Sequence, residues 1–208
     1  MKAIIMIGNG GHAKVIKDII DSSTEYELKG YLDDNISERY VEEGILYDNL
    51  GNIENYKEDF YFNIAIGGND IRASLFERIA LPLSKFPVLI HPSAIISPSA
   101  KIGYGTVIMP KSVINSNSLI GSHVIINTSS IIEHDNVIDD YVHISPNATL
   151  TGGVKVGKKS QVGASATIIP MVSIGKNTIV GAGSTVVKNI GDNQIVVGTP
   201  AKPIRSDK

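Results

Sequence analysis

An aliphatic residue recurs at every sixth position along a stretch of the chain that begins at Ile90 and ends at Val186. The series is Ile90, Ile96, Ile102, Ile108, Ile114, Ile120, Ile126, Ile132, Ile138, Ile144, Leu150, Val156, Val162, Ile168, Ile174, Val180 and Val186. The residue four positions after each member of this series is small or β-branched, and Asn136 is the exception. A fixed period over so long a stretch indicates a repeat architecture.

A period of six fits neither an α-helix nor a simple alternating strand. It fits a parallel β-helix in which three hexapeptides form one coil of eighteen residues, so residues eighteen apart stack at about 4.8 Å. Four glycines and one aspartate lie on one such ladder and directly follow an inward aliphatic residue. We expect a positive φ at these corners, which glycine tolerates best. They are Gly103, Gly121, Asp139, Gly157 and Gly175.

Composition excludes several classes of function. The net charge is −2 and 19% of residues are charged, which disfavours nucleic-acid binding driven by charge. The sequence contains no cysteine, so disulfides, thiolate zinc sites and cysteine nucleophiles are excluded, as is common in the cytoplasm. The apolar run Ala3–Ile7 is too short to span a bilayer. We therefore expect a cytoplasmic protein without nucleic-acid or membrane partners.

The first residues of the chain predict a strand, a glycine turn and a helix. Lys2–Ile7 is apolar, the turn runs from Gly8 to Ala13 with a GxGxxA pattern, and Val15, Ile16, Ile19 and Ile20 follow at helical spacing. This order is typical of nucleotide-binding units, in which glycines and the helix N-terminus accept a phosphate. The alternative is a purely structural turn.

Two further strands are predicted in the same region. Glu27–Leu32 ends at Asp33 and Asp34, which lie where a ribose or base contact is expected, or else form a solvated turn. Tyr61–Ile66 runs into Gly67 and Gly68, and a helix ending before Pro82 follows. Both glycine turns would lie at the carboxyl edge of a parallel sheet.

The predicted organisation is a Rossmann-like α/β domain over 1–82, a linker over 83–92, a β-helix over 93–190 and a capping tail over 191–208. A coil must cover its last unpaired strand edge, and a proline-bearing extended tail does so.

We expect His134 to be a catalytic residue. It is followed by Asp135 and lies two residues past the inward aliphatic residue Ile132, near a corner of the coil. One coil above it lies Gly152, in the glycine pair of the coil. A base and an unobstructed backbone N–H on the same surface are what acyl transfer requires. His143 lies half a coil from His134, on another face, so the two would meet only across an interface, as in a trimer. The alternative for His143 is an exposed histidine without a role.

The chain resembles the hexapeptide-repeat acyltransferases through its period and its VGTPAKPI ending, and the resemblance implies a left-handed coil. The order GxxGH, DD, IAIGGND-IR, IHPSA, IIEHD and VGTPAKPI is similar to that of sugar acetyltransferases that join a nucleotide-sugar-binding domain to a left-handed β-helix. This family includes UDP-4-amino-sugar N-acetyltransferases, perosamine N-acetyltransferases and sialic acid O-acetyltransferases.

The resemblance implies a role for each matching residue. His134 would be the general base and Asp135, usually a glutamate in the family, would orient it. His143 would lie near the acetyl-CoA thioester, and the Gly152 N–H would bind the acetyl carbonyl. The residues implied in further coenzyme A contacts are Pro200 and Lys202; those implied in nucleotide-sugar binding are Gly8, Asn9, Gly10, Gly11, His12, Asp33, Asp34, Gly67 and Gly68. The family is trimeric, with sites between neighbouring coils.

We therefore expect acetyl-CoA-dependent N-acetylation of a nucleotide-linked, UDP-type 4-amino-4,6-dideoxy sugar in bacterial glycan biosynthesis. O-acetylation of a sialic acid or another hydroxyl stays open, because the same base and donor would serve it. A nicotinamide-dependent oxidoreductase would leave the coil unexplained. A metal site is not expected, because His123, His134 and His143 share no ladder. A structural repeat, such as an ice-binding surface, would need a regular ladder of outward threonines, which we do not expect.

Overall fold

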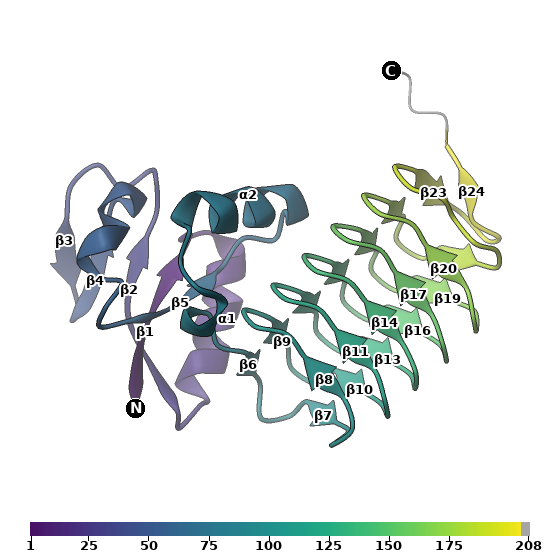
Figure 1. The fold of residues 1–208 in the computed structure, drawn as a ribbon, viewed down its shortest axis with the longest axis horizontal. Coiled ribbons are helices and arrows are strands. Elements are labelled where there is room, and N and C mark those ends of the chain that lie inside the picture. The colour runs from purple at the N-terminus through teal and green to yellow at the C-terminus, as the bar shows by residue number, and fades with distance from the viewer. Residues whose placement is uncertain (205–208) are drawn as a thin grey trace.

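The computed structural model describes residues 1–204, so the last four residues of the predicted tail lie outside the described residues. The chain begins with an α/β unit and continues as a long coil of short strands (Figure 1). None of the helices within the described residues is long and apolar enough to cross a membrane.

The α/β unit is built on a five-stranded sheet of order β3-β4-β2-β1-β5, in which only β3 is antiparallel to its neighbour. Its elements are β1 (Lys2–Ile7), α1 (Gly11–Asp21), β2 (Tyr26–Leu32), β3 (Tyr40–Glu42), β4 (Ile45–Asp48), a 3-10 helix (Leu50–Asn55), β5 (Tyr61–Ile64), α2 (Asn69–Ile79) and a second 3-10 helix (Leu83–Lys85). Ile4, Ile5 and Met6 of β1 are fully buried, as expected for a central parallel strand covered on both faces.

The coil has three faces, each a sheet of stacked short strands. Sheet I contains β6 (Leu89–Ile90), β9 (Val107–Ile108), β12 (Ile125–Ile126), β15 (His143–Ile144), β18 (Gln161–Val162), β21 (Ile179–Val180), β23 (Ile195–Val197) and β24 (Lys202–Pro203). Sheet II contains β7 (Ile95–Ile96), β10 (Val113–Ile114), β13 (Ile131–Ile132), β16 (Thr149–Leu150), β19 (Thr167–Ile168) and β22 (Thr185–Val186). Sheet III contains β8 (Lys101–Ile102), β11 (Leu119–Ile120), β14 (Val137–Ile138), β17 (Lys155–Val156) and β20 (Ser173–Ile174).

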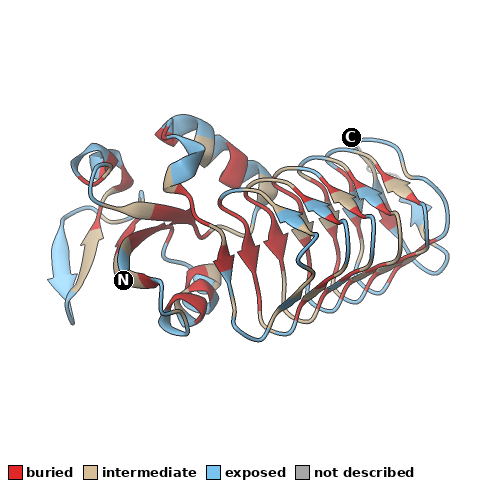
Figure 2. Ribbon diagram, turned by 60° about the horizontal axis from the view of Figure 1, so that its bottom comes forward, coloured by how far each residue is buried: buried red, intermediate tan, exposed pale blue. Residues whose placement is uncertain are grey.

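The register of the coil follows the predicted period of eighteen. Ile114 pairs with Ile132, and Ile132 pairs with Leu150, in parallel ladders. These inward residues are fully buried and form one continuous core along the coil, visible as red bands along its strands in Figure 2. The parallel β-helix predicted from the repeat is confirmed.

The glycine ladder has a different cause from the one we predicted. Within residues 1–204, Gly103 and its ladder partners are absent from the positions with positive φ. From Ile102 to Val180, positive φ occurs instead three residues past each inward aliphatic residue, as at Asn117 (60°) and Asp135 (59°). A Cβ added at Gly103 would lie 2.6 Å from the carbonyl carbon of Gly121. Glycine is therefore favoured there by the close stacking of consecutive coils, and the predicted positive φ was wrong.

Sheet II also carries threonines that we did not expect. Thr149 pairs with Thr167, and Thr167 pairs with Thr185, so three threonines form a ladder on this face. The expectation of no outward threonine ladder was wrong for these coils. The ladder does not continue downwards, since Ile131 and Val113 occupy the preceding positions.

The two parts of the molecule pack directly on each other. Strand β6 lies inside the stretch predicted as a linker and pairs with β9 as the first strand of sheet I. Leu89, Val107 and Ile125 of sheet I share one apolar cluster with Ile16 and Ile20 of α1. At the other end of the coil, β24 pairs antiparallel with β23.

Candidate active site

His134 and Gly152 lie against each other at one corner of the coil, immediately after β13 and β16. A Cβ added at Gly152 would lie 2.6 Å from both Cε1 and Nε2 of His134. The imidazole therefore stands over the bare backbone of the coil above, and any side chain at Gly152 would displace it.

The imidazole is oriented by its neighbour in the sequence. His134 Nδ1 lies 2.7 Å from Asp135 Oδ2, and Asn117 Nδ2 lies 3.3 Å from the other oxygen of that carboxylate. The hydrogen bond from His134 lowers the pKa of Asp135, so the carboxylate stays ionised and accepts. With Nδ1 directed at this carboxylate, Nε2 is the ring nitrogen that faces Gly152.

The Gly152 N–H has no intramolecular acceptor among residues 1–204. The same ladder position is proline at Pro98 and Pro170, which shows that the coil does not need an N–H there. The turn itself is fixed, since Gly153 N donates to His134 O at 2.9 Å and Met171 N donates to Gly152 O at 3.0 Å. Gly152 therefore presents a preorganised donor, as an oxyanion site requires.

Asn136 holds the two turns together, and sequence reasoning missed this role. Its fully buried Nδ2 lies 2.6 Å from Glu133 O, 3.3 Å from His134 O and 3.0 Å from Thr151 O. These carbonyls belong to the turns of the base and of the donor. The signal was present in the repeat, because Asn136 is the exception to its small-residue position.

His143 lies elsewhere, in β15 of sheet I, and is half-buried, so the alternative of an exposed histidine was wrong. Asn127 Oδ1 accepts from Thr128 N, so Asn127 Nδ2 is the donor to His143 Nε2, at 3.0 Å. The ring centroid lies 6.4 Å from that of His12. Burial, and secondarily the charge of Arg72, lower the pKa of His143 to about 4, so the ring is neutral.

The first glycine turn is held by an acidic residue. Gly8 has a φ of 99°, and an added Cβ would lie 2.5 Å from Ile66 Cδ1, so glycine is required there. Asn9 N donates to Asp33 Oδ2 at 2.9 Å, and Asn35 N donates to the other oxygen of that carboxylate. Asp33 thus ties the turn to the end of β2. Asp34 lies beside it and pairs with Arg78 at 2.8 Å.

Space for a ligand surrounds both glycine turns. A Cβ added at Gly10, Gly11 or Gly67 would meet nothing within 4 Å, whereas a Cβ added at Gly68 would lie 3.4 Å from Ile71 Cδ1. Helix α1 begins after Gly10 without a side-chain cap, which leaves its first N–H groups open to an anion. A cavity of ≈ 190 Å³ opens at this edge, lined by Ile7, Gly8, Leu32, Asp33, Asp34, Asn35, Leu50, Ile66, Ile71 and Leu75.

His12 links this edge to the coil. Burial, and then the charge of Arg72, lower its pKa to about 4. Its Nε2 is buried and lacks a hydrogen-bond partner among residues 1–204. The structure therefore gathers Gly8–His12, Gly67 and His143 in one region, and His134 with Gly152 in another.

Pro200 and Lys202 are exposed in the tail at the far end of the coil. Ala201 N, between them, donates to Thr185 O of sheet II at 2.8 Å. The two residues therefore lie near the top of the face that carries β13 and β16, beside β22, which is two coils above β16.

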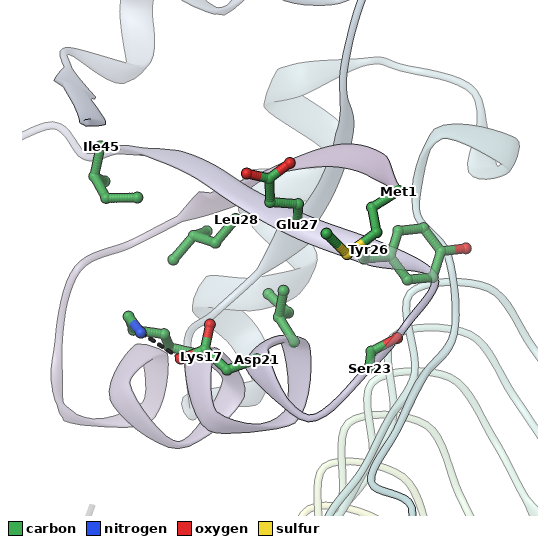
Figure 3. Close-up of a pocket in the computed structure, with 9 residues that line it drawn as sticks. Met1, Lys17, Asp21, Ser23, Tyr26, Glu27, Leu28 and Ile45 are labelled. Atoms are coloured by element: carbon green, nitrogen blue, oxygen red, sulfur yellow. Dashed lines mark hydrogen bonds and ion pairs between the residues drawn. The ribbon is translucent and has the colours of Figure 1, made fainter. Parts of the chain in front are cut away.

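A second cavity of ≈ 240 Å³ lies at the amino ends of β1 and β2, opposite the glycine turns (Figure 3). Its lining includes Lys17 and Asp21 of α1, and none of the predicted site residues. Within residues 1–204, no group of three or more His, Cys, Asp or Glu side chains could hold a metal ion.

The fold and the corner site define a class, the two-part acyltransferases that join a nucleotide-binding α/β unit to a hexapeptide β-helix. Residues 3–79 match the family model described as PglD N-terminal domain. A UDP-N-acetylbacillosamine N-acetyltransferase of Bacillus subtilis (strain 168) is 43% identical over 114 residues, and the match spans 52% of each chain, about half the length of that relative.

Solved structures match the whole chain. The perosamine N-acetyltransferase of Caulobacter crescentus, a mutant in complex with CoA and GDP-perosamine, has a TM-score of 0.89 at 32% identity and covers 99% of this chain and 98% of its own. The acetyltransferase domain of PglB from Neisseria gonorrhoeae has a TM-score of 0.89 at 36% identity, with coverage of 98% and 100%. The chain therefore belongs to this family of sugar N-acetyltransferases, and its coil is the left-handed β-helix predicted from the resemblance.

Proposed function

We propose that the protein transfers the acetyl group of acetyl-CoA to the amino group of a UDP-linked 4-amino-4,6-dideoxy sugar. The observation that carries this proposal is the position of His134 Nε2 only 2.6 Å from where a Cβ of Gly152 would lie, beside a backbone N–H that the coil does not use. The family supports it, since the curated relative acts on a UDP-linked amino sugar and a solved PglB acetyltransferase domain contains acetyl coenzyme A.

In this mechanism His134 removes a proton from the attacking sugar amine, which must be neutral to react. The amine nitrogen bonds to the thioester carbon, and the oxyanion that forms is stabilised by the Gly152 N–H. Collapse of the tetrahedral intermediate breaks the C–S bond, and the proton held by His134 passes to the sulfur of coenzyme A. Asp135 keeps the ring oriented throughout. No covalent enzyme intermediate is needed.

Each part of the chain has a proposed task. Residues 1–82 would bind the nucleotide sugar, with the diphosphate at Gly8–His12, the base beside Asp33 and Asp34, and the sugar toward Gly67 and Gly68. Residues 83–92 would connect to the β-helix domain, 93–190. The tail, 191–208, would cap the coil and contact coenzyme A through Pro200 and Lys202, while His143 would lie near the thioester.

A homotrimer would complete the site. Sheet I packs on the α/β unit, whereas His134 and Gly152 follow strands of sheet II. One chain therefore holds its glycine turns and its general base, His134, on different sides of the coil. Ile95 and Ile131, on the outer side of sheet II, are 66% and 36% exposed and would form part of the contact. A cytoplasmic location, where acetyl-CoA and nucleotide sugars occur, is part of this proposal.

The test measures release of the coenzyme A thiol and the mass of the product. UDP-4-amino-4,6-dideoxy sugars, the GDP- and dTDP-linked counterparts, and CMP-sialic acid serve as acceptors. We expect stoichiometric thiol release and N-acetylated product with the UDP-linked amino sugar. Turnover of CMP-sialic acid alone would instead establish O-acetylation, and absence of turnover with every acceptor would refute acetyl transfer to sugars.

A further inference from the structure

Arg72 of α2 is the largest fully buried side chain of the molecule's described residues, and it is only 1% exposed. Its side chain extends from the α/β unit to the coil, against which α2 lies in Figure 1. Its Nε donates to His123 O at 2.8 Å and its Nη2 donates to Tyr141 O at 2.9 Å. These two carbonyls lie on consecutive coils, so one guanidinium spans both.

The same guanidinium holds the loop between β5 and α2. Its Nη1 donates to Ile66 O at 3.0 Å and to Gly67 O at 3.3 Å, and its Nη2 donates to Asn69 Oδ1 at 2.9 Å. Asn69 continues the connection, since its Nδ2 donates to Lys159 O at 3.0 Å. Arg72 therefore joins the second glycine turn to the wall of the coil through a planar fork that lysine cannot reproduce.

A gain in folding free energy does not by itself explain why Arg72 is buried here. Within residues 1–204 no carboxylate lies within ion-pair distance of Arg72, and burial lowers its pKa to about 10. Burying a cation among carbonyl dipoles alone costs desolvation free energy, and apolar residues of similar volume serve stability at least as well. A precise geometry is what the fork supplies in return.

The residues that Arg72 connects include or directly precede those that the two substrates would contact. Gly67 lies at the edge of the sheet where the nucleotide sugar would bind, and Tyr141 and Val142 directly precede His143. We propose that Arg72 is a positioning residue, which sets the sugar site of one chain at the correct distance from the coil wall that carries His143. This inference rests on the proposed acetyl transfer.

The test compares Arg72→Lys, which keeps the charge and loses the fork, with Arg72→Met, which loses both. We expect kcat to fall by about 10- to 100-fold in both variants, because small misplacements of bound reactants cost this much. The Kd values of UDP and of coenzyme A, each measured alone by calorimetry, should stay within about twofold of the wild type, because each subsite keeps its own residues.

Lys159→Ala is the matched control. It removes the ion pair between Lys159 and Asp70 (3.3 Å), which also joins the two parts of the molecule, and kcat should be unchanged. If an Arg72 variant does not fold, Asn69→Ala removes one branch of the same network, and we expect kcat about tenfold lower with unchanged Kd values.

Full kcat in folded Arg72 variants, with only a lower Tm, would overturn the positioning role and leave a structural one. A parallel loss of UDP affinity and kcat would overturn it too, since Arg72 would then support one subsite. Neither outcome bears on the proposed function, which fails only if the wild type shows no acetyl transfer.

Discussion

The β-helix and the α/β unit differ in how spatial contacts relate to distance along the sequence. In the coil, neighbours across strands lie eighteen residues apart at every level below the last, as with Ile114, Ile132 and Leu150. Where the α/β unit meets the coil, Arg72 contacts His123 and Tyr141, which are 51 and 69 residues away, and neither separation is a multiple of eighteen. Substitutions in the two regions should therefore have effects of different kinds.

The largest effect is expected where the coil supplies the base. Replacing His134 by Ala should lower kcat by about 10²- to 10⁴-fold, because proton removal from the amine loses its acceptor. The measurement is steady-state thiol release with saturating substrates. His91→Ala is the control, since His91 lies on an earlier coil and bonds to Ser93, and it should keep normal kcat. Near-normal turnover of the His134 variant would assign the base to another residue.

A smaller but still large effect is expected one coil above. Gly152→Ala places a Cβ 2.6 Å from the His134 ring, so the ring or the turn must shift, and kcat should fall by about 100-fold. Gly191→Ala is a suitable control, because its Cβ would approach only the side chain of Gln194, at 3.3 Å. Unchanged kcat in Gly152→Ala would show that the base and the donor do not act as a pair.

Asn136 tests whether the two turns must be held together. Asn136→Ala removes the amide that reaches Glu133 O, His134 O and Thr151 O. We expect kcat to fall by about tenfold, with little change in KM. Ser118→Ala removes a single bond to Glu133 O and should leave kcat nearly intact. Equal effects of the two substitutions would argue against a special role for Asn136.

The smallest effect concerns stability at the junction and not catalysis. His123 is 1% exposed, stacks on Tyr141, and has no hydrogen-bond partner for either ring nitrogen among residues 1–204. Burial is the main cause that lowers its pKa to about 4, and the charge of Arg72 adds to this. The unfolded chain binds a proton near pH 6.5 and the folded chain does not. Its contribution to stability is therefore complete above pH 6.5 and is lost as the pH falls toward 4.

Between pH 7 and pH 5, His123→Phe should lose about 2 kcal/mol less of its unfolding free energy than the wild type. Urea titrations at the two pH values measure this difference, and kcat at pH 7 should stay within about twofold. An identical pH dependence in both proteins would contradict a neutral, buried His123.

The same contrast explains what the sequence could predict. The pairing of His134 with Gly152 follows from counting residues, because the coil repeats its geometry at every turn. Counting did not reveal why Gly103 must be glycine, since a ladder position indicates stacking without giving backbone angles. Asn136 stood out as an exception to the repeat, but its bonds to the catalytic turns required coordinates.

The α/β unit was predictable only in outline. Its glycine turns and the strand ending at Asp33 were visible as local patterns. The partial burial of His143 and the network of Arg72 were not visible, because both depend on how the α/β unit packs against the coil. A single arginine in a helix carries no sign that its guanidinium will bridge two coils.

The most direct test of the account is a crystal structure of the protein with coenzyme A and a UDP-4-amino-4,6-dideoxy sugar. We expect the 4-amino nitrogen of a sugar bound to one protomer to lie within hydrogen-bond distance of Nε2 of a neighbouring protomer's His134, with the Gly152 N–H directed at the thioester position. A sugar amine placed next to a different base, or a single protomer with its own sugar against its own His134, would contradict it.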